Sequence, residues 1–96
     1  MLERIREKRD EIYAIARKHK AEKLWVFGSC ARGEERPDSD VDFLVSFKKG
    51  VTLFDMGGLY STLKELLGCE VDVVDDFAMG HDPFFAYTVR RDMVAL

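Results

Sequence analysis

The sequence lacks the features that mark secreted and membrane proteins. Its two cysteines, Cys30 and Cys69, lie far apart and form no CxxC pair, so they indicate reduced thiols and no disulfide framework. The uncharged run Leu24–Ala31 is far shorter than the roughly 20 apolar residues that a bilayer-spanning helix needs. The N-terminal stretch MLERIREKRDE contains no apolar segment of the kind found in secretory signals. We therefore expect a cytoplasmic protein without a membrane partner.

An excess of basic residues is also missing. The net charge is −3 and the pI about 5.3, so the sequence predicts no strong nucleic-acid-binding surface. There are no internal repeats and no low-complexity segments, and 47% of the residues are hydrophobic and 34% charged, which is typical of a globular protein. A chain of 96 residues is expected to form a single domain, residues 1–96, with one modest core.

The hydrophobic pattern predicts an α+β fold in which a mixed β-sheet of about three to four strands packs against helices. Helices are expected at residues 2–20, from about 52 to 67 and from 83 onward, and strands at residues 24–27, 41–47 and 70–74. Thr52 is a candidate N-cap, Gly68 ends the second helix, and Pro83 suits the first position of the third. We attribute Gly57-Gly58 to close packing against the sheet, because no Lys-Ser/Thr follows as in a phosphate-binding loop.

The acidic residues are concentrated in one short segment. Residues 34–42 carry five carboxylates against the single Arg36, whereas residues 1–23 have a surplus of Lys and Arg that suits the solvated face of a helix. Closely packed carboxylates repel one another, and water, a salt bridge or a divalent cation could offset that repulsion.

The segment FGSCARGEERPDSDVDFLV, residues 27–45, carries the clearest functional signal. The first strand ends at Gly28-Ser29, and Asp40 follows ten residues later at the start of the second strand. Because this connection is short for a parallel crossover, the strands are expected to be antiparallel neighbours, with Gly28-Ser29 facing Asp40. Asp40 and Asp42 then project from the same face, about 6.6 Å apart at Cα. Two carboxylates so placed can share one divalent ion or flank a pair of ions.

Asp72 is the candidate third carboxylate. It lies between Val71 and Val73 in the third predicted strand, where a charge is costly unless it is matched. If that strand lies beside the second one, Asp72 completes a three-carboxylate site. Plainer interpretations stay open, because a single Asp in a strand is usually a surface residue and Asp-Ser-Asp is common in loops. A calcium-binding helix–loop–helix does not match, since its sixth loop position holds Phe43 and its twelfth Lys49.

This combination of residues resembles the minimal nucleotidyltransferases of the DNA polymerase β superfamily. The matching motif is Gly28-Ser29, ten further residues and Asp40-Val41-Asp42, with Asp72 as the third carboxylate. The strings GSCARG and SDVD, at residues 28–33 and 39–42, are similar to those of small prokaryotic members that act as antitoxins beside HEPN-domain toxins. The resemblance implies a nucleotidyltransferase fold, ATP and Mg²⁺, and transfer of AMP to a tyrosine hydroxyl of a HEPN-type toxin.

The resemblance also implies a role for each residue of the motif. Asp40, Asp42 and Asp72 are expected to be the catalytic carboxylates and to hold two Mg²⁺ ions, which bind the triphosphate and lower the pKa of the attacking hydroxyl. Asp72 is further expected to accept the proton of that hydroxyl. The residues expected to bind the nucleotide are Gly28, Ser29, Arg32 and Ser39.

Elementary chemistry predicts roles for the residues of this segment and for the two histidines. Gly28 lets the backbone approach the phosphates without a Cβ, and Ser29 is expected to cap a short helical turn where phosphate is favoured. Arg32 either pairs with a phosphate or forms a salt bridge to Glu34 or Glu35. Cys30 is expected to be a small buried hydrophobe, and His19 and His81 to be surface or capping residues.

A chain of this length leaves little beyond the catalytic sheet, so we expect the acceptor to be held by a partner protein or by a second copy of the chain. Phe84, Phe85 and Tyr87 either offer aromatic surface to such a partner or close the single core. Two other functions stay open. One is a non-catalytic antitoxin that neutralises its partner by binding it. The other, less favoured because no acceptor domain is predicted, is nucleotidyl transfer to a small molecule.

Overall fold

The computed structural model describes all 96 residues and contains a four-stranded mixed sheet with the strand order β3-β2-β1-β4. Strand β1 (Ala21–Phe27) lies antiparallel to β2 (Val41–Phe47), and β3 (Val71–Asp75) lies parallel to β2 on its other side. The short β4 (Val94–Ala95) pairs antiparallel with β1. The predicted α+β class, mixed sheet and antiparallel first pair are confirmed, and β3 is an edge strand.

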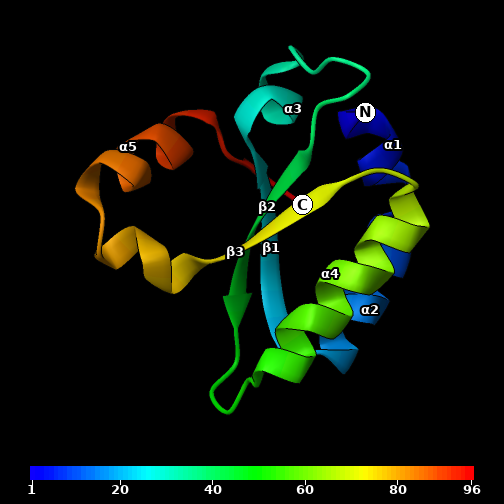
Figure 1. Cartoon of the computed structure of the whole chain (residues 1–96), viewed down its shortest axis with the longest axis vertical. Helices are drawn as coiled ribbons and strands as arrows, with labels where there is room; N and C mark the ends of the chain where they lie inside the picture. The colour runs from blue at the N-terminus through cyan, green and yellow to red at the C-terminus, as the bar shows by residue number, and fades with distance from the viewer.

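Helices α2 (Arg9–Lys18) and α4 (Leu53–Leu67) cover one face of the sheet, with α1 (Leu2–Glu7) beside them (Figure 1). The main core lies in this layer and holds 16 buried residues. Helix α4 contributes leucines at four-residue spacing, and β2 contributes alternate residues, as expected for these two periodicities. These side chains are Leu59, Leu63 and Leu67 of the helix and Val41, Phe43 and Val45 of the strand. None of the helices has the length and hydropathy needed to cross a membrane.

A smaller layer covers the opposite face of the sheet (Figure 1). It consists of the 3₁₀ helix η1 (Asp76–Gly80) and α5 (Pro83–Asp92), with α3 (Gly28–Arg32) following directly on β1. A second buried cluster lies here, formed by Phe27, Leu44 and Val89. Because successive strand residues alternate between faces, Asp42 shares this face with Leu44.

The N-terminal segment forms two helices, which corrects the single helix expected over the first 20 residues. Lys8 ends α1 and begins α2. No Pro or Gly marks the break, and the apolar stripe continues across it, since Ile5 and Ile12 are both fully buried. Tyr13, which the pattern did not assign to the core, is also buried, and its hydroxyl accepts a hydrogen bond from the N–H of Leu24 at 3.1 Å.

The strand boundaries also differ from those expected. Strand β1 begins at Ala21, three residues before the predicted start, because the exposed Glu22 and Lys23 interrupt its apolar pattern where the pairing with β2 is irregular. Strand β3 is displaced by one residue. Strand β4 and helix η1 were not predicted at all, because two residues of strand and one short 3₁₀ turn are too short to carry a periodicity.

The ends of the longer helices follow the expected chemistry. The Thr52 hydroxyl accepts a hydrogen bond from the N–H of Asp55 at 3.2 Å, and the Asp55 carboxylate accepts one from the N–H of Thr52 at 3.0 Å, which is a capping box. Gly68 ends α4 in the left-handed conformation with φ 67°. The Asp82 side chain caps α5, with Pro83 at its first turn.

The two glycines of α4 were expected to pack closely against the sheet, and the structure corrects this expectation. A Cβ on Gly58 would overlap the imidazole of His19, lying 2.8 Å from its Nδ1, whereas a Cβ on Gly57 would meet no atom within 4 Å. His19 follows α2 as its C-cap residue. The close contact is therefore between two helices, and only one of the two glycines takes part in it.

This difference predicts opposite tolerance at neighbouring positions. Gly57→Ala should raise the free energy of unfolding by up to about 1 kcal/mol, because Ala has the higher helix propensity and nothing obstructs its methyl group. Gly58→Ala should gain less or lose stability, because the His19 ring must move to admit the methyl group. Urea unfolding of both variants and the parent measures the difference. Equal gains at the two positions would contradict the contact with His19.

Candidate active site

Three segments that are distant in the sequence meet at one end of the sheet. They are the end of β1 with the start of α3, the start of β2, and the start of β3 (Figure 1). The register pairs Phe27 with Asp42 across β1 and β2, and Asp42 with Asp72 across β2 and β3. Two of the three predicted carboxylates are therefore direct neighbours on adjacent strands, whose spacing is about 4.8 Å.

Gly28 closes this arrangement from the side of β1. Its φ is 73°, in the left-handed region, and a Cβ there would overlap Oδ2 of Asp42 and lie 3.4 Å from its Cγ. A side chain at position 28 is thus disfavoured both by the backbone conformation and by the Asp42 carboxylate. The close backbone approach expected here exists, but Gly28 lies against Asp42 and does not simply face Asp40.

The environment of Asp42 opposes its negative charge. Partial burial raises the pKa of the Asp42 carboxyl above its usual range, and the neighbouring carboxylates of Asp72 and Asp40 raise that pKa further. The Arg32 guanidinium offsets part of this effect. Asp42 is therefore a half-buried carboxylate with like charges beside it, an arrangement that is costly in the absence of a cation.

Asp72 and Asp40 lie on either side of this central carboxylate. Asp72 is exposed on the edge strand β3, which agrees with the plainer interpretation of a surface residue as far as its burial is concerned. Asp40 is also exposed and lies one residue before the first residue of β2, so it is a loop residue and not the opening residue of the strand. Its effect on the pKa of Asp42 shows that it is nonetheless near.

The two serines of the motif have different surroundings. Ser29 does not cap α3 as expected, because the helix already begins at Gly28 and its N-cap residue is Phe27, which forms no side-chain cap. The Ser39 hydroxyl accepts a hydrogen bond from the N–H of Arg36 at 2.8 Å, which closes the loop before Asp40. Gly33 ends α3 in the left-handed conformation with φ 72°.

Arg32 forms an ion pair that the sequence did not reveal. Its Nη1 lies 2.6 Å from Oδ2 of Asp92 at the end of α5, and its Nε lies 3.0 Å from Oε2 of Glu34. The expected partner Glu34 is confirmed, whereas Glu35 pairs with the amino group of Met1 at 2.9 Å. The Asp92 side chain is only 6% exposed, so the pair joins α3 to α5 beside the carboxylates. No sequence signal links two residues sixty positions apart.

The carboxylates suit a hard divalent cation such as Mg²⁺, which prefers oxygen ligands. Asp40, Asp42 and Asp72 form no salt bridge, so no basic side chain cancels their charge directly. No three His, Cys, Asp or Glu side chains are close enough as they stand to coordinate one ion together. The structure thus supports the pair Asp42 and Asp72, with Asp40 nearby, and the three-ligand arrangement stays a prediction.

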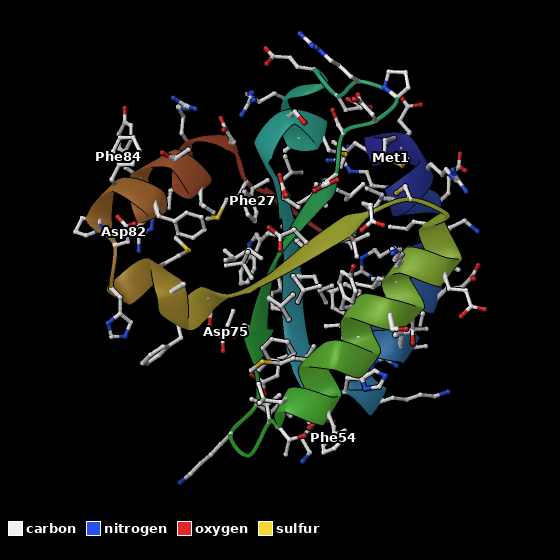
Figure 2. All side chains as sticks on the ribbon, viewed as in Figure 1. Met1, Phe27, Phe54, Asp75, Asp82 and Phe84 are labelled. Atoms are coloured by element: carbon white, nitrogen blue, oxygen red, sulfur yellow. The ribbon has the colours of Figure 1, made fainter.

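The remaining predicted residues divide between core and surface. Cys30 is fully buried in the main core, as expected, and burial raises the pKa of its thiol. Phe85 packs edge-on against Phe27, with ring centroids 6.0 Å apart, so it closes the second buried cluster. Phe84 and Tyr87 are instead 80% and 67% exposed, and Figure 2 shows Phe84 projecting away from α5. Phe85 thus belongs to the buried part of the fold, and a partner contact at Phe84 and Tyr87 stays a prediction.

Comparison with known proteins agrees with this geometry. Residues 10–96 match the family model described as polymerase beta, nucleotidyltransferase. The protein adenylyltransferase MntA of Thermococcus cleftensis is 38% identical over 93 residues, which cover 88% of this chain and 92% of the relative. A solved minimal nucleotidyltransferase is 40% identical and superposes with a TM-score of 0.84, covering 99% of this chain and 95% of the other.

More distant structures share the fold. A toxin–antitoxin complex with AMP-PNP matches with a TM-score of 0.72 at 22% identity, covering 90% of this chain and 69% of the other. A complex of the tri-AMPylated Shewanella oneidensis HEPN toxin with its MNT antitoxin matches with a TM-score of 0.67 at 18% identity, covering 94% and 69%. The predicted resemblance is confirmed: this chain belongs to the polymerase β nucleotidyltransferase family and is a minimal member of it.

Proposed function

We propose that this protein transfers AMP from ATP to a hydroxyl group, expected to be that of a tyrosine, on a HEPN-type partner protein and thereby acts as its antitoxin. The observation that carries the proposal is the register pair of Asp42 and Asp72, with Gly28 closed against Asp42. The names of the relatives support it, since they include a protein adenylyltransferase and complexes of a HEPN toxin with its antitoxin.

The reaction assigns a different task to each side of the site. The acceptor oxygen attacks the α-phosphorus of ATP, a P–O bond to the acceptor forms, and the bond to the β-phosphate breaks to release pyrophosphate. Asp72 is exposed and therefore open to the acceptor, so it is proposed to take the proton of the hydroxyl. Gly28 and Ser29, at the start of α3, are proposed to bind the phosphates through the main chain and the serine hydroxyl.

The proposed metal ligands are Asp40, Asp42 and Asp72, which would together hold two Mg²⁺ ions. Bound Mg²⁺ neutralises phosphate charge and lowers the pKa of the attacking hydroxyl. The raised pKa of Asp42 fits this role, because a carboxylate whose charge is opposed by its surroundings gains most from a cation. Ser39 is proposed to lie near the nucleotide at the end of the loop that it closes.

Arg32 is proposed to contact phosphate as well, which requires it to leave at least one of its present partners. Its guanidinium now bonds to both Asp92 and Glu34. Glu34 is exposed, so this bond is the weaker one and the easier to exchange for a phosphate oxygen. The Asp92 bond would then keep the guanidinium oriented beside the carboxylates.

A second candidate function is that of an antitoxin that neutralises its partner by binding alone. The exposed aromatic side chains of Phe84 and Tyr87 favour a protein partner of this kind. A binding module has no use for carboxylates that repel one another, and for this reason we favour transfer. Transfer to a small molecule is less favoured, because the relatives are named as protein adenylyltransferases.

One experiment separates these functions. The protein is incubated with α-labelled ATP, Mg²⁺ and the protein encoded next to it, the candidate HEPN-domain partner. We expect label on the HEPN-domain protein. A stable complex without label would support binding alone, and label on neither protein together with no complex would contradict both functions.

The metal ligands provide the first test of the site. Asp40→Asn and Asp42→Asn, made separately, should each reduce AMP transfer to background, because each removes a ligand charge. The fold should remain intact, because neither residue belongs to the buried core. Single-turnover transfer and thermal unfolding of each variant check both statements, and full turnover in either variant would contradict the two-metal site.

Stability provides an independent readout at Asp42. Its pKa in the folded state lies above the unfolded value, so the ionised carboxylate opposes folding at neutral pH. Without Mg²⁺, Asp42→Asn should therefore be at least as stable as the parent at pH 7. As the pH falls through the raised pKa of Asp42, the parent should recover this difference. A variant that unfolds more easily at every pH would show that Asp42 is a structural residue.

Asp72→Asn separates proton transfer from nucleotide binding. If Asp72 accepts the acceptor proton, the transfer rate should fall by about 10²–10⁴-fold, whereas the affinity for Mg·ATP should stay within a few-fold of the parent. ATP titrations and single-turnover rates measure the two quantities in parallel. A collapse of both would make Asp72 a primary ligand of the nucleotide-bound metal, and no change in either would make it an ordinary strand residue.

A further inference from the structure

An apolar groove lies along β3, beside the carboxylate site. It has a volume of about 300 Å³ and runs between that strand and the first half of α4. Figure 2 labels Asp75, which lines the groove at the end of β3, and Phe54, which follows the lining residue Leu53 at the start of α4. The helix wall includes Leu53, Met56 and Tyr60, and the strand wall includes Val73 and Asp72.

Asp72 belongs to both the groove and the carboxylate site. It is the register partner of Asp42 in the sheet, and it also lines the groove. Since β3 is an edge strand, the side chain of an edge residue is accessible from the rim as well as from the face. The neighbouring Val73 faces the α4 layer, whereas Asp72 projects to the face of Asp42, so an extended segment paired along the edge of β3 presents alternate side chains to the groove and to the carboxylates.

The groove is exposed in a way that suits a protein segment. Strand β3 pairs only with β2, so its outer edge has no strand neighbour and can pair with an added extended segment. At the start of α4, Leu53 and Phe54 are 84% and 92% exposed, although they are large apolar side chains. A volume of about 300 Å³ is at the lower limit for a pocket that takes a whole small molecule.

The charge of the groove indicates which side chains a bound protein segment should carry. The charged residues that line the groove are Asp72 and Asp75, and no Lys or Arg lines it. The nearby Lys64 is held by Glu70, with 2.7 Å between Nζ and Oε1. A segment with apolar and basic side chains around its hydroxyl complements this lining, whereas an acidic segment is repelled.

We propose that this groove holds the segment of the acceptor protein that carries the modified hydroxyl, extended along β3 with the hydroxyl at Asp72. The inference rests on the proposed function, because it assigns the groove to the acceptor of AMP transfer. Another exposed apolar surface, Phe84 and Tyr87 on α5, lines neither this groove nor the cavity at Asp40. The groove thus positions the acceptor, and α5 is free for other contacts.

Gly57 offers a way to block the groove without disturbing the fold. It lines the groove, and a Cβ added there would meet no atom within 4 Å. Gly57→Leu should therefore place a side chain in the groove, and its higher helix propensity should preserve or increase stability. Gly57→Ala is the matched control, since it makes the same change to the helix with only one methyl group.

The test uses the full chain, ATP, Mg²⁺ and the candidate HEPN-domain partner, the protein encoded next to this one. In Gly57→Leu, the Michaelis constant for the acceptor protein should rise at least 10-fold, while that for ATP stays within threefold of the parent. Gly57→Ala should keep the acceptor constant within threefold. An unchanged acceptor constant in Gly57→Leu, or an equal rise in Gly57→Ala, would overturn the proposal.

A second variant tests the charge of the groove. Asp75→Asn removes one carboxylate but keeps an oxygen that can accept the bond that Asp75 now accepts from the N–H of Phe77. Acceptor binding should weaken several-fold at low salt, and the difference from the parent should shrink as salt is added. If binding strengthens or stays the same at low salt, the assignment of a basic segment to the groove is wrong.

The outcome remains informative if the parent transfers no AMP. In that case the proposed function fails. The docking role of the groove is then tested by measuring the affinity of this chain, with the same substitutions, for the partner protein. Weaker binding in Gly57→Leu than in Gly57→Ala would keep the groove as the docking site, and equal binding would overturn it. If Gly57→Leu instead separates a dimer of this chain without affecting acceptor binding, the occupant is a second copy and the proposal is wrong.

Discussion

The repulsion between Asp42 and Asp72 is the constraint on which the rest of the site depends. The strand order places β2 between β1 and β3, so the two carboxylates become register partners on neighbouring strands. Partial burial and the like charges raise the pKa of Asp42, and no basic side chain pairs with either carboxylate. Gly28 adds to the crowding because its backbone lies against the Asp42 carboxylate. This arrangement lowers the stability of the fold in the absence of a ligand, whereas a bound cation with its triphosphate would stabilise it.

The two faces of the sheet divide stability from chemistry. The main core, with α2 and α4, lies on one face and contains no charged residue. The other face holds a small cluster around Phe27, Leu44 and Val89, and the carboxylates lie at its end. The ion pair between Arg32 and Asp92 ties α5 to α3 there, so the second layer is held partly by charge beside the proposed phosphate site. Substitutions of the carboxylates therefore leave the main core untouched.

The position of β3 at the edge of the sheet decides how the site is reached. A central strand would have placed Asp72 between two neighbours, where only a small molecule could approach it. At the edge, Asp72 is exposed and shared between the carboxylate site and the apolar groove beside α4. Edge strands are usually protected against association with other chains. Here the exposed side chains of Leu53 and Phe54, at the start of α4, instead add apolar surface near the edge. This exposure is what connects the site to the proposed protein acceptor.

The sequence by itself determined the elements with strong local signals and the identity of the acidic motif. Thr52, Gly68 and Pro83 predicted helix ends because capping depends on neighbouring residues, and the short connection from Gly28 to Asp40 predicted an antiparallel pair because a parallel crossover needs more chain. Only the tertiary structure decided the break at Lys8, the strand β4, the exposure of Asp72 and the bond from Arg32 to Asp92. These features depend on contacts between distant segments or on the position of a strand within the sheet, and neither leaves a periodic trace in the chain.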